Sequence, residues 1–352
     1  MDTKIIEIHQ NNIEKALIEE AAKIIKNGGV VAFPTETVYG LGANGLDVEA
    51  VKKIFRAKGR PQDNPLILHV CSIDQVEELV EEVPNIAKVC MERFWPGPLT
   101  IIFRKSSIVP DIITAGLDTV AIRMPNHSIA LELIRFSDGP IAAPSANISG
   151  RPSPTSAKHV IEDMMGKVDM IIDGGSTGIG LESTVLDLSG DKPMILRPGG
   201  ITEEDLRKII PNVSLDFAII KEDENLIPKS PGQKYRHYAP KAEMIVFSGE
   251  IERIIEAIIL RTKENINLGK KVGIICTDET KDFYKECMSA IIISVGSRVE
   301  QETIAHNLFN TLRIFDEENI DIILSEGVEL SDLGVAIMNR MMKAASGKII
   351  KV

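Results

Sequence analysis

The amino-acid sequence predicts an α/β protein with two domains and a linker between them. In residues 1–210, several short apolar strands are separated by loops too short for a crossover helix, which indicates a mixed sheet. In residues 243–352, strands and helices alternate strictly, which indicates a smaller parallel, Rossmann-like sheet. Residues 211–242 contain several prolines and no hydrophobic periodicity, so we expect them to form the linker.

Length and composition agree with this division. The chain has 352 residues, which is long for one domain and comfortable for two. Hydrophobic residues make up 44%, so each domain can bury a core, and aromatic residues at 4% leave that core to Ile, Val, Leu and Met. The net charge of −11 argues against a protein that grips nucleic acid over its whole surface, although a local basic pocket remains compatible with it.

Cysteine usage and hydropathy bear on the location of the protein. The four cysteines form no C-x-x-C pair and indicate neither a zinc site nor a disulfide framework. The N-terminus has no apolar signal core, and no run of about 18 apolar residues occurs that would span a membrane. We therefore expect a cytoplasmic protein with reduced cysteines and no membrane contact.

The first domain begins with a helix that hydrophobic periodicity predicts over residues 13–26, ended by Asn27-Gly28-Gly29. A buried strand is expected at residues 30–33, and Pro34 then opens a loop that we expect to continue through Gly45. Further strands are expected at residues 66–70, 99–103, 119–122, 140–142, 170–172, 183–188 and 194–196. Further helices are expected at residues 48–57, 73–82, 87–94, 129–136 and 156–165.

The second domain alternates between the two kinds of element. Strands are expected at residues 244–247, 272–276, 290–295 and 320–324. Helices are expected at residues 251–263, 281–288, 301–315 and 332–345. No G-x-G-x-x-G motif follows the first of these strands, so a dinucleotide is not indicated, and the pattern assigns this domain no chemistry.

Two cations just after the helix at residues 48–57 are candidates for anion binding. Lys58 and Arg60 fall in the sequence Ala-Lys-Gly-Arg-Pro, whose Gly and Pro set the turn and the direction of both side chains. Arg binds phosphate bidentately and Lys binds it as a point charge. For the preceding Lys52 and Lys53 we favour the simpler reading, a helix end decorated with cations that suit the helix dipole.

Three loops that follow strands carry hydroxyl and amide side chains. Thr37 lies in a Gly-rich loop directly after the first buried strand, where α/β folds place ligands, although its hydroxyl also suits local backbone capping. Ser145 is not in a G-x-S-x-G motif, so we expect Ser145 and Asn147 to bind a phosphate or base and not to act as nucleophiles. The glycines before Ser183 lack the G-K-[ST] ending of a P-loop.

Charged residues also end or occupy strands. Arg123 and Arg197 each end a predicted strand, where an Arg pairs with a carboxylate or phosphate, or forms an ordinary surface ion pair. His69 lies inside a strand, a position at which a lone His is most often structural. Tyr235 lies in an unusually basic and aromatic part of the linker, for which a solvated tether and a functional segment are equally compatible.

Taken together, these segments closely resemble the YrdC-type threonylcarbamoyl-AMP synthases in their long, two-domain form. The K-x-R and S-x-N pair, here Lys58/Arg60 and Ser145/Asn147, is the most specific part of the match. The other matching stretches are residues 33–45, 64–69, 95–100, 115–125, 144–154, 180–184, 196–199 and 230–240. The resemblance implies a YrdC-like twisted mixed sheet around a basic cleft, and a linker at residues 211–242 that closes over the active site.

The resemblance also implies residue roles, which we carry over only where this sequence has the residue that the family motif expects. L-Threonine would be bound by Thr37, His69, Arg123, Ser183 and the backbone of Ala143. ATP would be bound by Lys58, Arg60, Asn64, Thr119, Ser145, Asn147, Ser153, Arg197 and Tyr235.

The implied activity is that of a nucleotidyltransferase. L-Threonine, bicarbonate and ATP would give threonylcarbamoyl-AMP and pyrophosphate, and a downstream tRNA threonylcarbamoyl transferase complex would use the product to modify tRNAs that read ANN codons. Mg²⁺ would arrive with ATP, since no cluster has metal-ligand spacing. Lys58 and Arg60 would be the catalytic cations, and replacing either by Ala is expected to cost about 2.7–4 kcal/mol of transition-state stabilisation with little effect on folding.

Two other functions are weighed against this one. A carbamoyltransferase of hydrogenase maturation embeds a similar domain, but that class resembles a larger chain with C-x-x-C zinc motifs, which this sequence lacks. A double-stranded RNA or tRNA-binding module without catalysis would suit a basic cleft, and weak RNA binding by such a cleft is compatible with an enzyme too. The net charge of −11 weakens the purely RNA-binding alternative.

Overall fold

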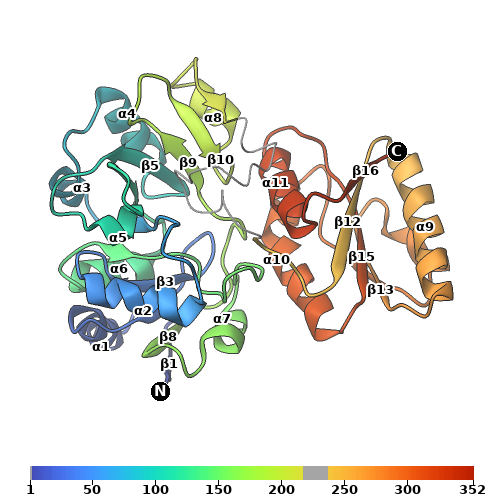
Figure 1. Cartoon of the computed structure of the whole chain (residues 1–352), viewed down its shortest axis with the longest axis horizontal. Coiled ribbons are helices and arrows are strands. Elements are labelled where there is room, and N and C mark those ends of the chain that lie inside the picture. Colours follow the sequence, from blue (N-terminus) through green and yellow to red (C-terminus); the bar gives the residue numbers. More distant parts are fainter. Residues whose placement is uncertain (1, 217–236) are drawn as a thin grey trace. The chain divides into compact units, whose positions relative to one another are not determined.

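The computed structural model describes residues 2–216 and 237–352, which divide into two compact units (Figure 1). The first unit comprises Met1–Ser149 and Ser153–Tyr235, and the second comprises Gly150–Pro152 and Arg236–Val352. The short segment Gly150–Pro152 is held inside the second unit by its backbone. The Pro152 carbonyl accepts a hydrogen bond from Arg313 at 2.6 Å.

The described part of the first unit is built on one mixed sheet. Its strands, in spatial order, are β1 (Lys4–Glu7), β8 (Met170–Asp173), β2 (Val31–Phe33), β3 (Gly40–Asn44), β7 (Ile141–Ala142), β4 (Ile67–His69), β6 (Thr119–Arg123), β5 (Leu99–Arg104), β9 (Thr184–Asp187), β10 (Met194–Arg197) and β11 (Ser214–Leu215). Parallel pairs such as β4 with β6 lie beside antiparallel pairs such as β5 with β6. The predicted mixed sheet is therefore confirmed.

The helices of this unit follow the predicted order with shifted ends. They are α1 (Lys15–Lys26), α2 (Val48–Lys58), α3 (Asp74–Leu79), α4 (Asn85–Phe94), α5 (Asp111–Thr114), α6 (Ser128–Phe136), α7 (Ala157–Met164) and α8 (Glu203–Arg207). The hydrophobic pattern did not predict α5 and α8, because helices of four or five residues are too short to show a period.

One prediction in this unit is wrong: the expected loop through Gly45 contains strand β3. Glycine is rare in strands, so the pattern around Gly40 and Gly42 indicated a loop. In the structure, a Cβ on Gly42 would lie 2.7 Å from both the Phe33 ring and the Ile141 side chain. Glycine is present here because two neighbouring strands place bulky side chains against its backbone.

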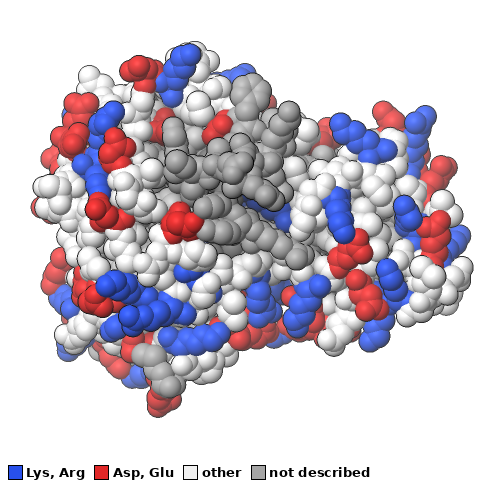
Figure 2. Space-filling view, viewed as in Figure 1, with Lys and Arg blue, Asp and Glu red and all other residues white. Residues whose placement is uncertain are grey.

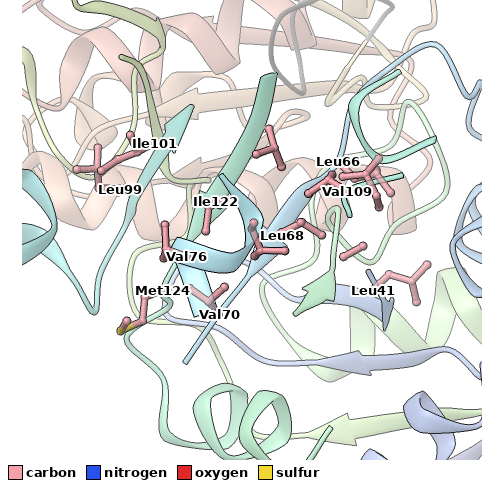
Figure 3. Packing of buried hydrophobic residues seen from close by; sticks show 14 of the residues in the cluster. Leu41, Leu66, Leu68, Val70, Val76, Leu99, Ile101, Val109, Ile122 and Met124 are labelled. Carbon is pink, nitrogen blue, oxygen red and sulfur yellow. The ribbon is translucent and has the colours of Figure 1, made fainter. Parts of the chain in front are cut away.

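The main apolar cluster lies on one face of the sheet, and a second cluster packs on the opposite face of β2, β7 and β8 together with α1 and α6. Successive strand residues point to opposite faces, and Leu66, Leu68 and Ile122 pack into the main cluster that Figure 3 shows. On the opposite face of the same strands, the apolar cluster is small and consists of Ile67, Ile102, Ala121, Val185 and Leu196. That face is where the polar residues of β4, β6 and β5 point.

The second unit is a parallel sheet, as predicted. Its strand order is β14 (Ile291–Ser294), β13 (Val272–Cys276), β15 (Ile322–Glu326), β12 (Glu243–Ser248) and β16 (Ile349–Lys351). Helix α9 (Ile251–Asn267) lies on one side of these strands, and α10 (Gln301–Glu317) and α11 (Gly334–Ala344) lie on the other (Figure 1).

One element of the second unit differs in type from the prediction. The helix expected at residues 281–288 is a short 3-10 helix, η2 (Lys281–Glu286), in which Tyr284 is the buried residue.

Within residues 2–216 and 237–352, no helix is both long enough and apolar enough to cross a membrane. Where described residues are visible in Figure 2, basic and acidic side chains are mixed over each unit.

Candidate functional site

A row of polar side chains crosses the face of the sheet opposite the main core. His69 of β4 and Arg123 of β6 are register partners, and Arg123 is also the partner of Thr100 in β5. His69 and Arg123 are each 4% exposed and Thr100 is fully buried. Buried polar side chains that lie next to each other on adjacent strands need hydrogen-bond partners, which can be each other or a ligand.

Hydrogen bonds extend this row to two further strands. The Thr100 and Ser183 hydroxyl oxygens lie 2.7 Å apart. Arg197 donates to the Ser183 hydroxyl at 3.1 Å and to the Ser183 carbonyl at 2.9 Å. We call His69, Arg123, Thr100, Ser183 and Arg197 the polar row. It joins four residues that the sequence singled out, and Thr100 is a member that sequence reasoning missed because it lies in an otherwise apolar strand.

Glu36, which is not among the site residues predicted from the sequence, forms an ion pair with the polar row. Glu36 Oε2 lies 2.7 Å from Arg123 Nη2, and the two side chains are 12% and 5% exposed. The neighbouring Thr37 carbonyl accepts a hydrogen bond from Gly180 at 3.1 Å, which ties this loop to the residues that precede Ser183. Sequence reasoning passed over Glu36, although it is the carboxylate in the loop after the first buried strand.

The histidine in the polar row is uncharged near neutral pH. Burial, with a smaller contribution from the Arg123 guanidinium, lowers the pKa of His69 to about 3. Its Nδ1 has no hydrogen-bond partner in the described part of the chain. A neutral imidazole here offers a directional hydrogen bond without adding a second charge beside Arg123.

The K-x-R and S-x-N motifs meet through Lys58. This lysine ends α2 and is 2% exposed, and Gly59 after it has a φ of 61°, the left-handed conformation that glycine favours. Lys58 Nζ donates to the Ser145 carbonyl at 2.5 Å and to the Asn147 carbonyl at 2.7 Å. The prediction that Lys58 lies past the helix end is therefore wrong. Its ammonium fixes the loop that carries Ser145 and Asn147.

Arg60 and Asn64 form a second small group just after Gly59, which follows the C-terminal end of α2. Arg60 Nη2 donates to the carbonyls of Asn64 and Pro65 at 3.3 and 3.1 Å. Asn64 is 1% exposed, and its Oδ1 accepts no hydrogen bond from the described residues. A buried amide oxygen of this kind is available to a donor on a ligand.

Of the remaining candidates, Ser153 is connected to the polar row through a hydrogen bond to Glu182. Ser153 donates to Glu182 at 2.5 Å, and Glu182 directly precedes Ser183. Ala143 donates its N–H to Ile67, two residues before His69. Thr119 starts β6, on the same face of the sheet as Arg123. Tyr235 lies outside the described residues.

We call Lys58, Ser145 and Asn147 the Lys58 group. The loop at residues 34–39 connects this group with the polar row. At one end, the Glu36 carboxylate is paired with Arg123. At the other end, the Tyr39 carbonyl accepts a hydrogen bond from Ala146 at 2.8 Å, between Ser145 and Asn147. The two groups of candidates therefore lie on either side of one short loop of the first unit.

The second unit has a polar cluster of its own at the carboxyl ends of its strands. Glu326 of β15, whose side chain is 1% exposed, accepts hydrogen bonds from Tyr284 at 2.7 Å and from Arg298 at 2.7 Å. Arg298 also lines a cavity of about 790 Å³, together with Glu279, Phe283 and Val328. The described residues include no group of His, Cys, Asp and Glu side chains arranged to hold a metal ion.

Comparison with protein-family models matches both parts of the chain. Residues 23–199 match the Sua5/YciO/YrdC model, which is described as "Telomere recombination". Residues 201–346 match the model described as "Threonylcarbamoyl-AMP synthase, C-terminal domain". The resemblance stated from the sequence motifs is confirmed.

Individual relatives match over almost the full length. The chain is 52% identical to the threonylcarbamoyl-AMP synthase of Pyrococcus abyssi, covering 99% of this chain and 100% of that one. It is 49% identical to the threonylcarbamoyl-AMP synthase of Bacillus subtilis, covering 95% and 94%. The crystal structure of Pyrococcus abyssi Sua5 complexed with L-threonine superimposes with a TM-score of 0.94 at 50% identity, covering 99% and 100%.

Proposed function

This chain belongs to the Sua5/YciO/YrdC family, and from this premise we propose that it is an L-threonylcarbamoyladenylate synthase. The reaction joins L-threonine, bicarbonate and ATP into threonylcarbamoyl-AMP and releases pyrophosphate, which makes the protein a nucleotidyltransferase. The observation that carries the proposal is the buried polar row beside the Lys58 group. It offers one site for a small zwitterion and, across one loop, a second site for a nucleotide.

The polar row suits L-threonine. Arg123 supplies a guanidinium for the substrate carboxylate, and the neutral His69 and the Ser183 hydroxyl supply hydrogen bonds for the rest of a small polar molecule. Threonine binding is assigned to Thr37, His69, Arg123, Ala143 and Ser183. The solved structure of the relative from Pyrococcus abyssi is complexed with L-threonine, which supports threonine as the substrate.

The nucleotide is assigned mainly to the other side of the loop, with Ser153 and Arg197 reaching it from the side of the polar row. Its proposed ligands among the described residues are Lys58, Arg60, Asn64, Thr119, Ser145, Asn147, Ser153 and Arg197. Lys58 acts here through the loop that it fixes, whereas Arg60 is a partly exposed residue that we assign to meet a phosphate directly. Mg²⁺ comes with ATP and is held by phosphates and water, because residues 2–216 and 237–352 include no cluster of side chains arranged to hold a metal ion.

The chemistry requires positioning more than covalent catalysis. The substrate's own nitrogen becomes a carbamate, and the carbamate oxygen attacks the α-phosphorus and displaces pyrophosphate. Two anions must therefore be brought together, and Arg60 and Arg197 reduce their repulsion while the buried row keeps water away from a labile intermediate.

The product places this enzyme before a group transfer to RNA. Threonylcarbamoyl-AMP is a mixed anhydride, so its acyl group passes readily to a nucleophilic amine. We assign its consumption to a tRNA threonylcarbamoyl transferase complex that modifies tRNAs reading ANN codons, in the cytoplasm where ATP and tRNA meet.

Pyrophosphate release tests the proposal. The purified chain is incubated with ATP and Mg²⁺, with both L-threonine and bicarbonate, with either one alone, and with neither. Release only when both are present supports the assignment, whereas release that ignores them contradicts it. RNA binding that falls steeply with salt, without any pyrophosphate release, would favour the RNA-binding alternative.

A further inference from the structure

Glu36 has an environment that a structural carboxylate rarely has. It lies in the loop at residues 34–39, and its side chain is 12% exposed. Apart from the ion pair with Arg123, neither carboxylate oxygen accepts a hydrogen bond from any described residue. Burying a carboxylate is costly unless donors surround it, and an isolated buried ion pair contributes little to stability. The structure therefore leaves hydrogen-bonding capacity on Glu36 that a ligand can use.

The pair of charges at this point is the complement of an α-amino acid. A carboxylate and an ammonium group occupy one carbon atom in such a molecule, so its two charges lie side by side. Arg123 and Glu36 present a positive and a negative group 2.7 Å apart. When the substrate carboxylate pairs with Arg123, the substrate ammonium group is directed to Glu36.

We propose that Glu36 is a further catalytic residue, which binds the ammonium group of L-threonine and accepts its proton. This inference rests on the proposed function and deepens it. An α-ammonium group is mostly protonated near neutral pH and has no lone pair with which to attack carbon. A base in contact with the nitrogen removes that obstacle.

The step balances with the substrates already named. The proton moves from the threonine nitrogen to a Glu36 oxygen, which leaves a neutral amine and a neutral carboxyl group. The nitrogen lone pair attacks the carbon of bicarbonate, a C–N bond forms, and one water molecule leaves. The product is the carbamate anion that attacks ATP, and Glu36 later returns its proton to solvent.

The charged and titratable groups around Glu36 leave Glu36 as the residue that can accept the proton from the substrate nitrogen. Arg123 of β6 is the cation paired with it, and His69 of β4 is the register partner of Arg123. His127, which follows β6, is 5% exposed, and its Nε2 lies 2.5 Å from the Gln10 amide nitrogen. Burial lowers the pKa of His127 to about 4, although the Glu36 carboxylate acts in the opposite direction. Both histidines are therefore neutral near pH 7, and Arg123 remains the fixed charge beside Glu36.

The test compares Glu36→Gln with the wild-type chain over a range of pH. The substitution keeps the size of the side chain and removes its charge and basicity. We expect kcat/KM for L-threonine to fall about 10²–10³-fold near neutral pH. The deficit should shrink as the pH rises above the pKa of the free substrate amine, because the amine is then already deprotonated. Glu49→Gln, which changes an exposed glutamate paired with Lys52, is the matched control.

Three results separate the possibilities. Wild-type kinetics in Glu36→Gln at every pH would overturn the proposal, as would a loss that does not depend on pH. If Glu36→Gln fails to fold, Glu36→Asp decides, since a carboxylate withdrawn by one methylene should lower kcat, and an unchanged kcat would overturn the role. A wild-type chain that releases no pyrophosphate would instead refute the proposed function itself.

Discussion

Lys58 shows how burial changes the expected role of a single cation. The family motif suggests a phosphate ligand, but Lys58 is 2% exposed and its ammonium donates to two backbone carbonyls of the loop at residues 145–147. Lysines are almost never buried to this extent unless they are paired or hydrogen-bonded. Lys58 therefore holds the loop at residues 145–147 in shape, and under the proposed function Arg60 is the residue assigned to meet a phosphate directly.

This difference leads to a prediction for two substitutions. Lys58→Met removes the donor for two buried carbonyls and should lower the free energy of unfolding by about 1–3 kcal/mol, in addition to impairing ATP use. Arg60→Met removes longer hydrogen bonds, to the Asn64 and Pro65 carbonyls at 3.3 and 3.1 Å, and should therefore cost less stability than Lys58→Met while impairing ATP use to a similar degree. Denaturant unfolding together with the KM for ATP checks both. Equal stability of the two variants would contradict this role of Lys58.

The buried histidines predict how stability depends on pH. The pKa of His69 is lowered to about 3 and that of His127 to about 4, both chiefly by burial. In the unfolded chain a His has a pKa near about 6.5, so the unfolded state binds more protons between that pH and the folded values. The stabilisation is fully present above the unfolded pKa and is lost as the pH falls through this window.

The expected slope is about 1.4 kcal/mol per pH unit for each histidine below about pH 6. His69→Asn should remove roughly one such contribution from the pH dependence of the unfolding free energy. The measurement is denaturant unfolding at several pH values from about 7 to 4. An unchanged pH dependence in the variant would show that His69 is protonated in the folded protein.

At the level of elements, strand β3 depends on the absence of a side chain at Gly42. A Cβ there would lie 2.7 Å from Phe33 and Ile141, both in the core. Gly42→Ala should therefore destabilise the first unit by about 1–3 kcal/mol through overpacking. Gly190→Ala is the control, because nothing lies within 4 Å of a Cβ at that position and its backbone is not left-handed. Thermal unfolding of both variants tests this, and equal melting temperatures would count against it.

In the second unit, the carboxyl ends of the strands are held together by Glu326. Tyr284 and Arg298 donate to it, and its side chain is 1% exposed. Arg298→Met removes the countercharge from a buried carboxylate and should cost about 1–3 kcal/mol of stability. Urea unfolding checks this value. A variant as stable as the wild type would contradict this role of Arg298.

For the whole molecule, hydrophobic patterning was enough to predict the two sheets and most helices. It could not predict the strand order, because β7 lies between β3 and β4, and β8 between β1 and β2, through contacts of segments far apart in the chain. The short edge strands β1, β11 and β16 were also missed, since two to four residues show no period.

The same limit applies to the site. Motifs identified Arg123, His69 and Ser183 individually, but their contact follows from strand register, which the sequence does not display. Thr100 and Glu36 belong to the site through that register and through the Arg123 ion pair. Burial of Lys58 likewise depends on a loop 87 residues away.

The central claim is that the first unit joins the threonine nitrogen, a carbon from bicarbonate and the α-phosphorus of ATP in one molecule. Mass spectrometry of the product formed from ¹³C-labelled bicarbonate tests it most directly. We predict an adduct of AMP and threonine that carries one labelled carbonyl carbon. An unlabelled threonine–AMP adduct, in which the amino-acid carboxylate itself is joined to phosphorus, would contradict the account.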